Sequence, residues 1–544
     1  MKRIINTVLI LATLSSAAFT LNSCQDALDI KQAGQLEDTD VYTSVANLNE
    51  VLNGSVYAQL EPIDEIYFTA VFTDEVKPGF GSGGQEFELH RYFLDPSTQV
   101  VGGGTVSTGS SNGIWLNNYL VINRVNRLLE GAKKITPNGA TETALYNSIL
   151  AQARAIRAYC YVQLEAYFSP DMKDPNALGV ILVKDVPATD AKLPRAKNQE
   201  VYDFINADLD YARGILGYST TDASRYTVGK AFVNSVTARF NLYRGNTALA
   251  KQYAQEVINN APIVDATTGS KLSLATPSQP SVTPPGVPPA IGTPAWNTAF
   301  YATASSFNPY RNLWNDSAKG EIVFSLNRLA LGAGQPIGTR WNTNQSNING
   351  VPMWVWGRNI YNIFKNTTGD IRRYAYVDPT TEENPAYEDP SEDPLDDALI
   401  IDKYPGKTST ATRNDIKVFR LSEMYFILAE AEAAAGNLTV AHDLIQKVRE
   451  ARNYLGAATT PTYTNAQTAY ADILKERRIE LALEGHRYLD LKRLATAAGV
   501  TMDRHATDDT VPVTNLPNNS YKYTLPIPIN EIAGNPNIQQ NPGY

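Results

Sequence analysis

Three carboxylates, a histidine and four arginines stand together in the stretch RRIELALEGHRYLDLKR, residues 477–493 of this 544-residue sequence. These residue types could carry general acid–base catalysis, in which a positioned side chain gives or takes a proton. Hydrolysis of a glycosidic bond, for example, needs two carboxyl groups that face each other across the sugar, about 5–9.5 Å apart. Glu480, Glu484 and Asp490, together with His486, are the residues to test for such an arrangement.

A helical arrangement would separate these groups instead of gathering them. At roughly 100° per residue, one face would carry Glu480, Glu484, Arg477 and Arg487, and the other side His486, Asp490 and Arg493. Apolar residues on two further faces predict a largely buried helix, in which every carboxylate needs a partner. We therefore expect two sets of ion pairs that hold the helix in place. Glu480 and Glu484 would pair with Arg477 and Arg487, and Asp490 would pair with Arg493. Gly485 is the position that could bend or end this helix.

Composition and motifs argue against several classes of function. The formal net charge is −9 and no long basic stretch is present, whereas nucleic-acid binding needs clustered Lys and Arg. The sequence has no His-Glu-x-x-His motif and no Walker loop, and its four histidines are scattered. We therefore expect a protein that is not an enzyme, has no cofactor and binds no nucleic acid.

Aromatic residues provide a different kind of candidate site. Five of the six tryptophans fall between residues 295 and 376. The apolar faces of sugar rings stack on such side chains, while amides and carboxylates bind the hydroxyl groups. Burial in the core is the alternative for large aromatics. The predicted ligand contacts are Trp314, Trp341, Trp354, Trp356, Tyr310, Asn315 and Asn342, with Phe80 and Tyr92 from an earlier loop region.

The first 24 residues have the pattern of a secretory signal with a lipid-attachment site. Two basic residues precede the apolar and small-residue run VLILATLSSAAF (8–19), which is shorter than the roughly 20 apolar residues of a membrane-spanning helix. LNSC follows and resembles a bacterial lipobox with Cys24 as the lipidated residue. We therefore expect a signal peptide over residues 1–23 and a mature protein that is anchored to a membrane, not embedded in it. The other cysteine, Cys160, is expected to be a buried thiol.

Helical periodicity is strong in the rest of the chain. Residues 115–129, 145–168 and 199–216 repeat apolar side chains at three- and four-residue steps, which places them on one helix face. Residues 238–258 and 429–449 resemble each other, because each has Gly-Asn and then an alanine five residues after the glycine. The glycine suits the turn after a first helix. The alanine lets a second, antiparallel helix approach closely, as in tetratricopeptide hairpins.

The segments between the helices are irregular. We expect a tether over residues 25–50 and a long loop, rich in Gly, Ser and Thr, over 78–114. A large insertion separates the two hairpins and contains the proline-rich stretch 277–294 and a short strand at 321–326. Residues 378–397 include nine acidic side chains and predict a solvated loop. They lack the spacing of an EF-hand, but a calcium site remains the alternative.

Eight segments, spread over nearly the whole mature chain, share one family resemblance. They are CQDALDI (24–30), IWLNNYLVINRVNRLL (114–129), ARAIRAYCYVQLEAYF (153–168), LPRAKNQEVYDFINADLDYA (193–212), VGKAFVNSVTARFNLYRGN (228–246), VFRLSEMYFILAEAEA (418–433), ERRIELALEGHRYLDLKR (476–493) and LPIPINEIAGNPNIQQNPGY (525–544). In this order, and with the lipobox in front, they resemble the SusD/RagB family, outer-membrane nutrient-binding lipoproteins of Bacteroidetes.

The resemblance implies a mostly α-helical fold, in which a tetratricopeptide-like hairpin scaffold carries a large irregular, loop-rich insertion with short strands. The implied regions are a signal peptide (1–23), an N-terminal SusD-like helical region (24–220), a tetratricopeptide-like pair (221–276), an irregular Trp-rich ligand-binding region (277–415) and a C-terminal SusD/RagB helical region with its tail (416–544).

The function implied is also specific. Family members bind a glycan at the cell surface and act as a lid on a TonB-dependent, SusC-like outer-membrane transporter. The resemblance therefore implies a lipid-anchored protein of the outer membrane that faces the cell exterior. The alternatives are a peptide ligand, as in RagB-like import components, a lid without a ligand of its own, and a secreted glycoside hydrolase.

Overall fold

The computed structural model describes residues 41–84, 86–94, 109–218, 222–261, 269–275, 289–302, 309–329, 331–332, 334–341, 352–389, 391–407, 410 and 413–544. Cys24, Asn342 and most of the expected tether lie outside these residues. None of the described helices combines the length and the hydropathy that crossing a bilayer requires. One hydrophobic cluster runs through the molecule, from Val45 to Ile538.

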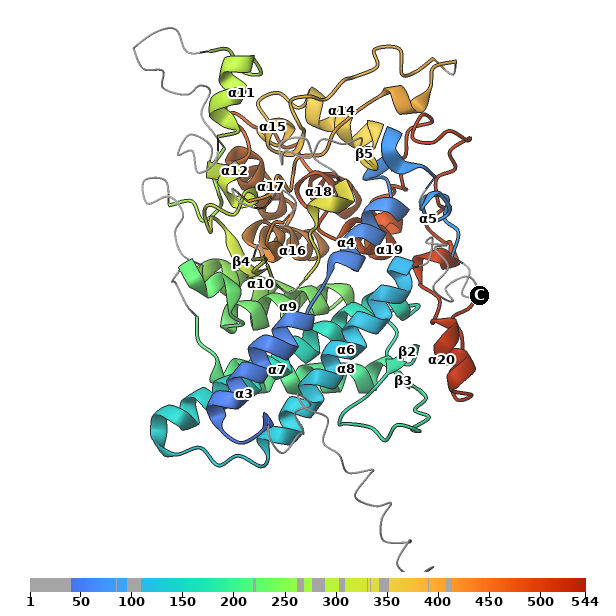
Figure 1. Ribbon diagram of the computed structural model, residues 1–544. Coiled ribbons are helices and arrows are strands. Elements are labelled where there is room, and N and C mark those ends of the chain that lie inside the picture. The colour runs from blue at the N-terminus through green and yellow to red at the C-terminus, as the bar shows by residue number, and fades with distance from the viewer. Residues whose placement is uncertain are drawn as a thin grey trace, which may run out of the picture.

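The N-terminal region is a layer of long helices, drawn in blue to green in Figure 1. Its elements are α3 (Val45–Val51), the π-helical η1 (Leu52–Tyr57), α4 (Ile63–Phe72), β1 (Val76–Pro78), η2 (Phe80–Ser82), α5 (Phe87–His90), α6 (Gly109–Ala132), α7 (Gly139–Phe168), β2 (Leu178–Ile181), β3 (Arg195–Lys197), α8 (Asn198–Ile215) and η3 (Asp222–Tyr226). α7 packs against both α6 and α8. Its second half is therefore buried almost completely, and Cys160 there is a buried free thiol, as predicted.

The two predicted helical hairpins are present. The first consists of α9 (Lys230–Tyr243) and α10 (Thr247–Asn260), and the second of α16 (Leu421–Ala434) and α17 (Leu438–Ala451). Gly245 and Gly436 have φ angles of 76° and 81°, a left-handed conformation that glycine adopts without strain. Ala250 and Ala441 are fully buried where the second helices meet their partners. α10 also packs against α16, so hairpins far apart in sequence are neighbours in the fold.

The insertion is joined to both other parts of the chain by two-stranded sheets. Its elements are α11 (Pro294–Phe300), α12 (Pro309–Trp314), β4 (Ile322–Leu326), α13 (Gly338–Trp341), β5 (Trp354–Trp356), α14 (Arg358–Asn366), α15 (Arg372–Tyr376) and η4 (Pro394–Asp396), followed by β6 (Ile416–Arg420). β5 pairs antiparallel with β1, with Trp356 opposite Val76. β4, which confirms the expected strand, pairs antiparallel with β6.

The C-terminal region adds α18 (Ala466–Glu480), α19 (Arg487–Ala498), η5 (Tyr521–Tyr523) and α20 (Ile529–Gly534). α18 packs against α16 and α17, and α19 packs against α18 and α4. α19, drawn in orange-red, thus lies beside α4, drawn in blue (Figure 1).

Three expectations for irregular segments need correction. The expected tether includes α3, and the expected loop 78–114 includes α5 and the start of α6. The acidic stretch 378–397 is only partly solvated, because Asp378 and Asp397 are buried. Asp397 accepts a hydrogen bond from Lys77 Nζ at 3.0 Å. Amino-acid composition did not predict these contacts. It shows that the residues are acidic, but it does not show which basic side chain pairs with a buried carboxylate.

Candidate functional site

The stretch 477–493 is not one helix. α18 ends at Glu480 and α19 begins at Arg487. Leu483 and Gly485 between them have positive φ angles of 58° and 83°. The chain turns at Gly485, which is the position that could end the helix. A single helical wheel therefore does not describe the residues after Glu480.

The ion pairs therefore differ from those predicted. Arg477 Nε bonds to Asp490 Oδ2 at 2.7 Å, and Arg487 Nη2 bonds to Asp74 Oδ2 at 2.7 Å. Neither arginine pairs with Glu480 or Glu484, the partners predicted for them. The predicted pair of Asp490 with Arg493 is present at 2.9 Å.

Glu480 lies at the centre of a buried group of cations. Its carboxylate accepts hydrogen bonds from Arg420 Nη1 at 2.8 Å, Arg452 Nη2 at 2.7 Å and Arg372 Nη1 at 3.0 Å. Burial alone would raise the pKa of Glu480, but the charges of Arg452 and Arg420 outweigh it and hold the pKa well below its usual value. A general acid in glycoside hydrolysis needs a raised pKa instead.

His486 is equally unsuited to proton transfer. Burial lowers its pKa well below the usual value, and the nearby charges of Arg239 and Arg477 lower it further. Its side chain and that of Glu480 are buried, and the side chain of Glu484 is 3% exposed, so a substrate cannot reach them in this conformation. The expectation of a structural role for residues 477–493 is thus supported by their geometry.

The tryptophans predicted to bind sugar are part of the core. Trp314, Trp341, Trp354 and Trp356 each have an exposed fraction of 0%. The charged groups around Trp314 belong to the protein itself, because Lys403 Nζ lies 4.3 Å and the Arg420 guanidinium 5.1 Å from the centre of its ring. The expectation that these rings are exposed for stacking is therefore corrected.

Three further predicted contacts are buried as well. Tyr310 has an exposed fraction of 0%, and its hydroxyl bonds to the Tyr376 hydroxyl. Tyr92 packs under the Arg504 guanidinium, 4.5 Å from its ring centre. Asn315 turns its side-chain oxygen toward its own loop, where it accepts from the Ser317 N–H at 3.0 Å. Polar residues beside an aromatic residue in the sequence therefore did not indicate that the aromatic ring is exposed. Such polar side chains can form hydrogen bonds within their own turn.

Phe80 is the predicted ligand contact that the structure exposes. Its side chain is 71% exposed, although the backbone on both sides is held tightly. The Gly79 N–H donates to Met353 O at 2.8 Å, and the Gly81 N–H donates to Pro352 O at 3.0 Å. A Cβ at Gly79 would lie 2.3 Å from Pro352 O, so only glycine permits this approach. An aromatic ring on such a clamped turn can stack on a sugar at little entropic cost.

Comparison with known proteins agrees with this architecture. The model of the SusD family (SusD_RagB) matches residues 370–544. SusD-like proteins P2 and P38 of Formosa agariphila are 24% and 23% identical to this chain, over 96% and 100% of it and 97% and 99% of their own lengths. A SusD superfamily protein of Bacteroides thetaiotaomicron superposes with a TM-score of 0.68 at 20% identity, covering 92% of this chain and all of that one. Residues 370–544 thus match the SusD family, and the chain is similar to SusD-like proteins over nearly its whole length.

A laminarin-binding SusD-like protein has the same fold, with a TM-score of 0.63 at 20% identity over 92% of this chain and 100% of its own. The residues that match the SusD family model include the second hairpin and the whole stretch 477–493. The stretch that most resembled an active site thus belongs to the part of the chain that identifies the fold.

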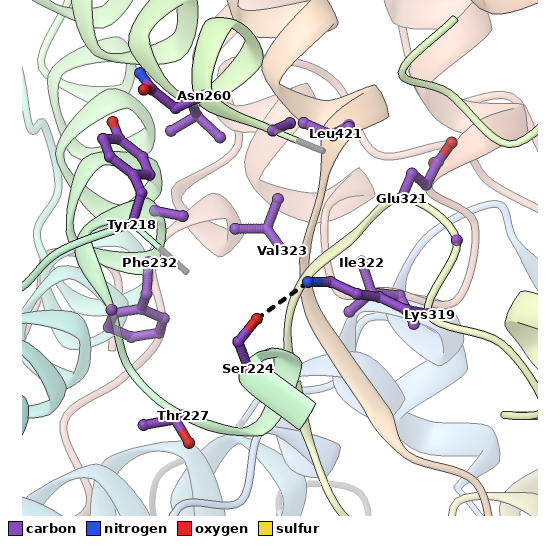
Figure 2. A pocket seen from close by; sticks show the side chains of 15 residues that line it. Tyr218, Ser224, Thr227, Phe232, Asn260, Lys319, Glu321, Ile322, Val323 and Leu421 are labelled. Atoms are coloured by element: carbon purple, nitrogen blue, oxygen red, sulfur yellow. Dashed lines mark hydrogen bonds between the residues drawn. The ribbon is translucent and has the colours of Figure 1, made fainter. Parts of the chain in front are cut away.

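A small cavity of this protein opens between η3, α9 and β4. Figure 2 shows Tyr218, Asn260 and Val323 around it, and Lys319 Nζ bonded to the Ser224 hydroxyl at 3.1 Å. The volume of the cavity is about 50 Å³. One water molecule takes up about 30 Å³, whereas typical ligand sites have volumes of about 300–1,000 Å³. A sugar does not fit there. Among the described residues, no group of His, Cys, Asp and Glu is arranged to hold a metal ion.

Proposed function

We propose that this protein is a non-enzymatic glycan-binding lipoprotein of the cell surface, and that it captures its ligand on the surface around Phe80. The observation that carries the proposal is the exposed ring of Phe80 on a turn clamped to residues 352–353. The shared fold with a laminarin-binding SusD-like protein supports glycan as the ligand class.

The proposed role within the cell rests on the resemblance to the SusD/RagB family. Once the signal peptide (1–23) is removed, the lipidated Cys24 anchors the protein in the outer membrane, facing outward. There it captures glycan and acts as a lid on a SusC-like, TonB-dependent transporter, which takes up the ligand. Replacing Cys24 with alanine is expected to release the protein from the membrane fraction, and purification of the membrane-bound protein is expected to retain the transporter.

Affinity electrophoresis tests the binding function. Purified protein is run through native gels that contain laminarin, starch, xylan or mannan, and retardation in at least one gel is expected. Phe80→Ala should abolish the retardation, whereas Leu249→Ala, at an exposed position on α10, should not. Unchanged migration of the wild type in every gel would contradict glycan binding, and release of new reducing ends would contradict a non-enzymatic role.

A further inference from the structure

A large polar groove lies on another part of the molecule. It has a volume of about 550 Å³, which is within the usual range of ligand sites, about 300–1,000 Å³. The end of α14 and the start of α15 form one side, and α17, α18 and the loop between them form the other. The lining residues include Asn366, Thr368, Arg449, Leu455, Ala457 and Lys475.

The floor of the groove is a row of alternating charges. Arg449 donates from Nη2 to Asp472 Oδ1 and from Nε to Glu476 Oε2, both at 2.8 Å. Arg372 continues the row, with Nη1 2.7 Å from Glu476 Oε1 and Nη2 2.7 Å from Asp370 Oδ2. These contacts hold each planar group in a defined orientation.

Part of this row is accessible. The side chains of Arg449 and Asp472 are 12% and 13% exposed, and Lys475 is exposed at the rim. Asn366, Thr367 and Thr368 are exposed on the α14 side. Across from them, Leu455, Ala457 and Pro461 provide a small apolar wall.

The charge balance selects the kind of ligand. An anion would meet the carboxylates of Asp370, Asp472 and Glu476, and a cation would meet the guanidinium groups and Lys475. A neutral hydroxyl group can donate to a carboxylate and accept from a guanidinium at the same time. Ordered charge pairs, amides and hydroxyls beside a small apolar wall therefore suit a polyhydroxylated molecule without net charge.

We propose that this groove is a second carbohydrate-binding site, which takes a short neutral oligosaccharide and recognises its hydroxyl groups without aromatic stacking. The site is separate from Phe80. The Phe80 turn is bonded to the residues before β5, whereas the groove begins where α14 ends, and α14 alone is about 14 Å long. Only the ligand class is shared with the proposed function.

The test uses the full chain in detergent and neutral trisaccharides as probes: laminaritriose, maltotriose, cellotriose and xylotriose. Calorimetry and saturation-transfer NMR measure binding to the Phe80→Ala protein, in which the first site is removed. At least one probe is expected to bind with one molecule per chain. Adding Ala457→Trp, which places an indole in the groove, should weaken that binding by about tenfold or more.

Two further variants make the result specific. Asp472→Asn keeps the shape of the floor but removes a charged acceptor, and it should also weaken binding. Ala188→Trp places the same indole at an exposed position between β2 and β3 and should leave binding unchanged. Charged probes, such as trigalacturonate, are expected to bind more weakly than the neutral ones.

The outcomes separate the two proposals. If the wild type binds trisaccharides and Phe80→Ala binds none, the groove is not a site, while the proposed function stands. If the Phe80→Ala protein binds a trisaccharide and the added Ala457→Trp substitution leaves that binding unchanged, the proposal of a second site in the groove is also overturned. If Ala457→Trp removes the binding of trisaccharides, the proposal of a second site in the groove is supported. This holds even if the retardation of the protein in polysaccharide gels does not depend on Phe80.

Discussion

Arg420 and Glu484 form a two-pronged ion pair inside the core. Arg420 donates from Nε to Glu484 Oε2 at 2.8 Å and from Nη2 to Oε1 at 2.7 Å. Lys403 Nζ donates to the same carboxylate at 2.7 Å. The pair joins the end of β6 to the turn between α18 and α19, and Lys403 connects the insertion to the same carboxylate.

Glu484→Ala is expected to lower the free energy of unfolding by about 3–5 kcal/mol, because Arg420 and Lys403 would remain buried without their counter-charge. Urea denaturation followed by circular dichroism measures the change. Glu130→Ala is the matched control, since Glu130 pairs with Lys133 on the exposed surface of α6 and should leave the unfolding midpoint nearly unchanged. Equal effects of the two substitutions would contradict the structural role of the pair.

Glu165 should make stability fall as the pH rises. It is buried, and burial raises its pKa from 4.5 to about 8. Between these two values the folded state holds a proton that the unfolded state has lost. The free energy of unfolding therefore decreases by roughly 1.4 kcal/mol per pH unit through this group.

Glu165→Gln removes this loss, so the stability of the variant relative to wild type should increase from pH 5 to pH 8 in urea denaturation. Glu484 serves as the opposite case, because Arg420 and Lys403 outweigh burial and lower its pKa. The contribution of Glu484 to the free energy of unfolding is present above its pKa in the unfolded chain. This contribution is lost as the pH falls through its pKa in the folded protein. Parallel pH profiles of wild type and Glu165→Gln would rule out the buried proton.

Trp314 and Phe80 should respond differently to truncation. Trp314→Ala is expected to cost about 3–5 kcal/mol of stability, because it leaves a cavity in the core. Phe80→Ala should leave the melting temperature nearly unchanged, since its ring is 71% exposed, and should affect glycan binding instead. Thermal denaturation of both variants distinguishes these roles. A stable Trp314→Ala protein that has lost glycan binding would restore the original assignment of that tryptophan.

Gly436 should resist substitution for a backbone reason alone. An added Cβ would meet no atom within 4 Å, but φ is 81°, where an L residue costs about 1–2 kcal/mol. Gly436→Ala is therefore expected to lower stability by that amount in urea denaturation. Gly214→Ala is the control, because Gly214 lies in α8 with equally open surroundings. It should raise stability by about 0.5–1 kcal/mol, and a gain for Gly436→Ala would contradict the turn geometry.

The candidate site was only partly predictable. Phe80 and Tyr92 were lesser candidates from one loop region, and of these two only Phe80 is exposed. Trp314 and Trp341 stand beside polar residues, but they are buried. The groove beside α14 could not be predicted, because Asp370 and Arg449, which line it, are brought together by packing of elements distant in the sequence.

The sequence by itself determined the helices, the two hairpins and the resemblance to the SusD/RagB family. These features depend on local periodicity and on the φ angles that Gly245 and Gly436 permit. Only the tertiary structure decided which charges pair and which rings are exposed. Arg487 bonds to Asp74, 413 residues away, and no helical wheel contains that partner. Burial and ion pairing depend on contacts between distant segments, and such contacts exist only in the folded chain.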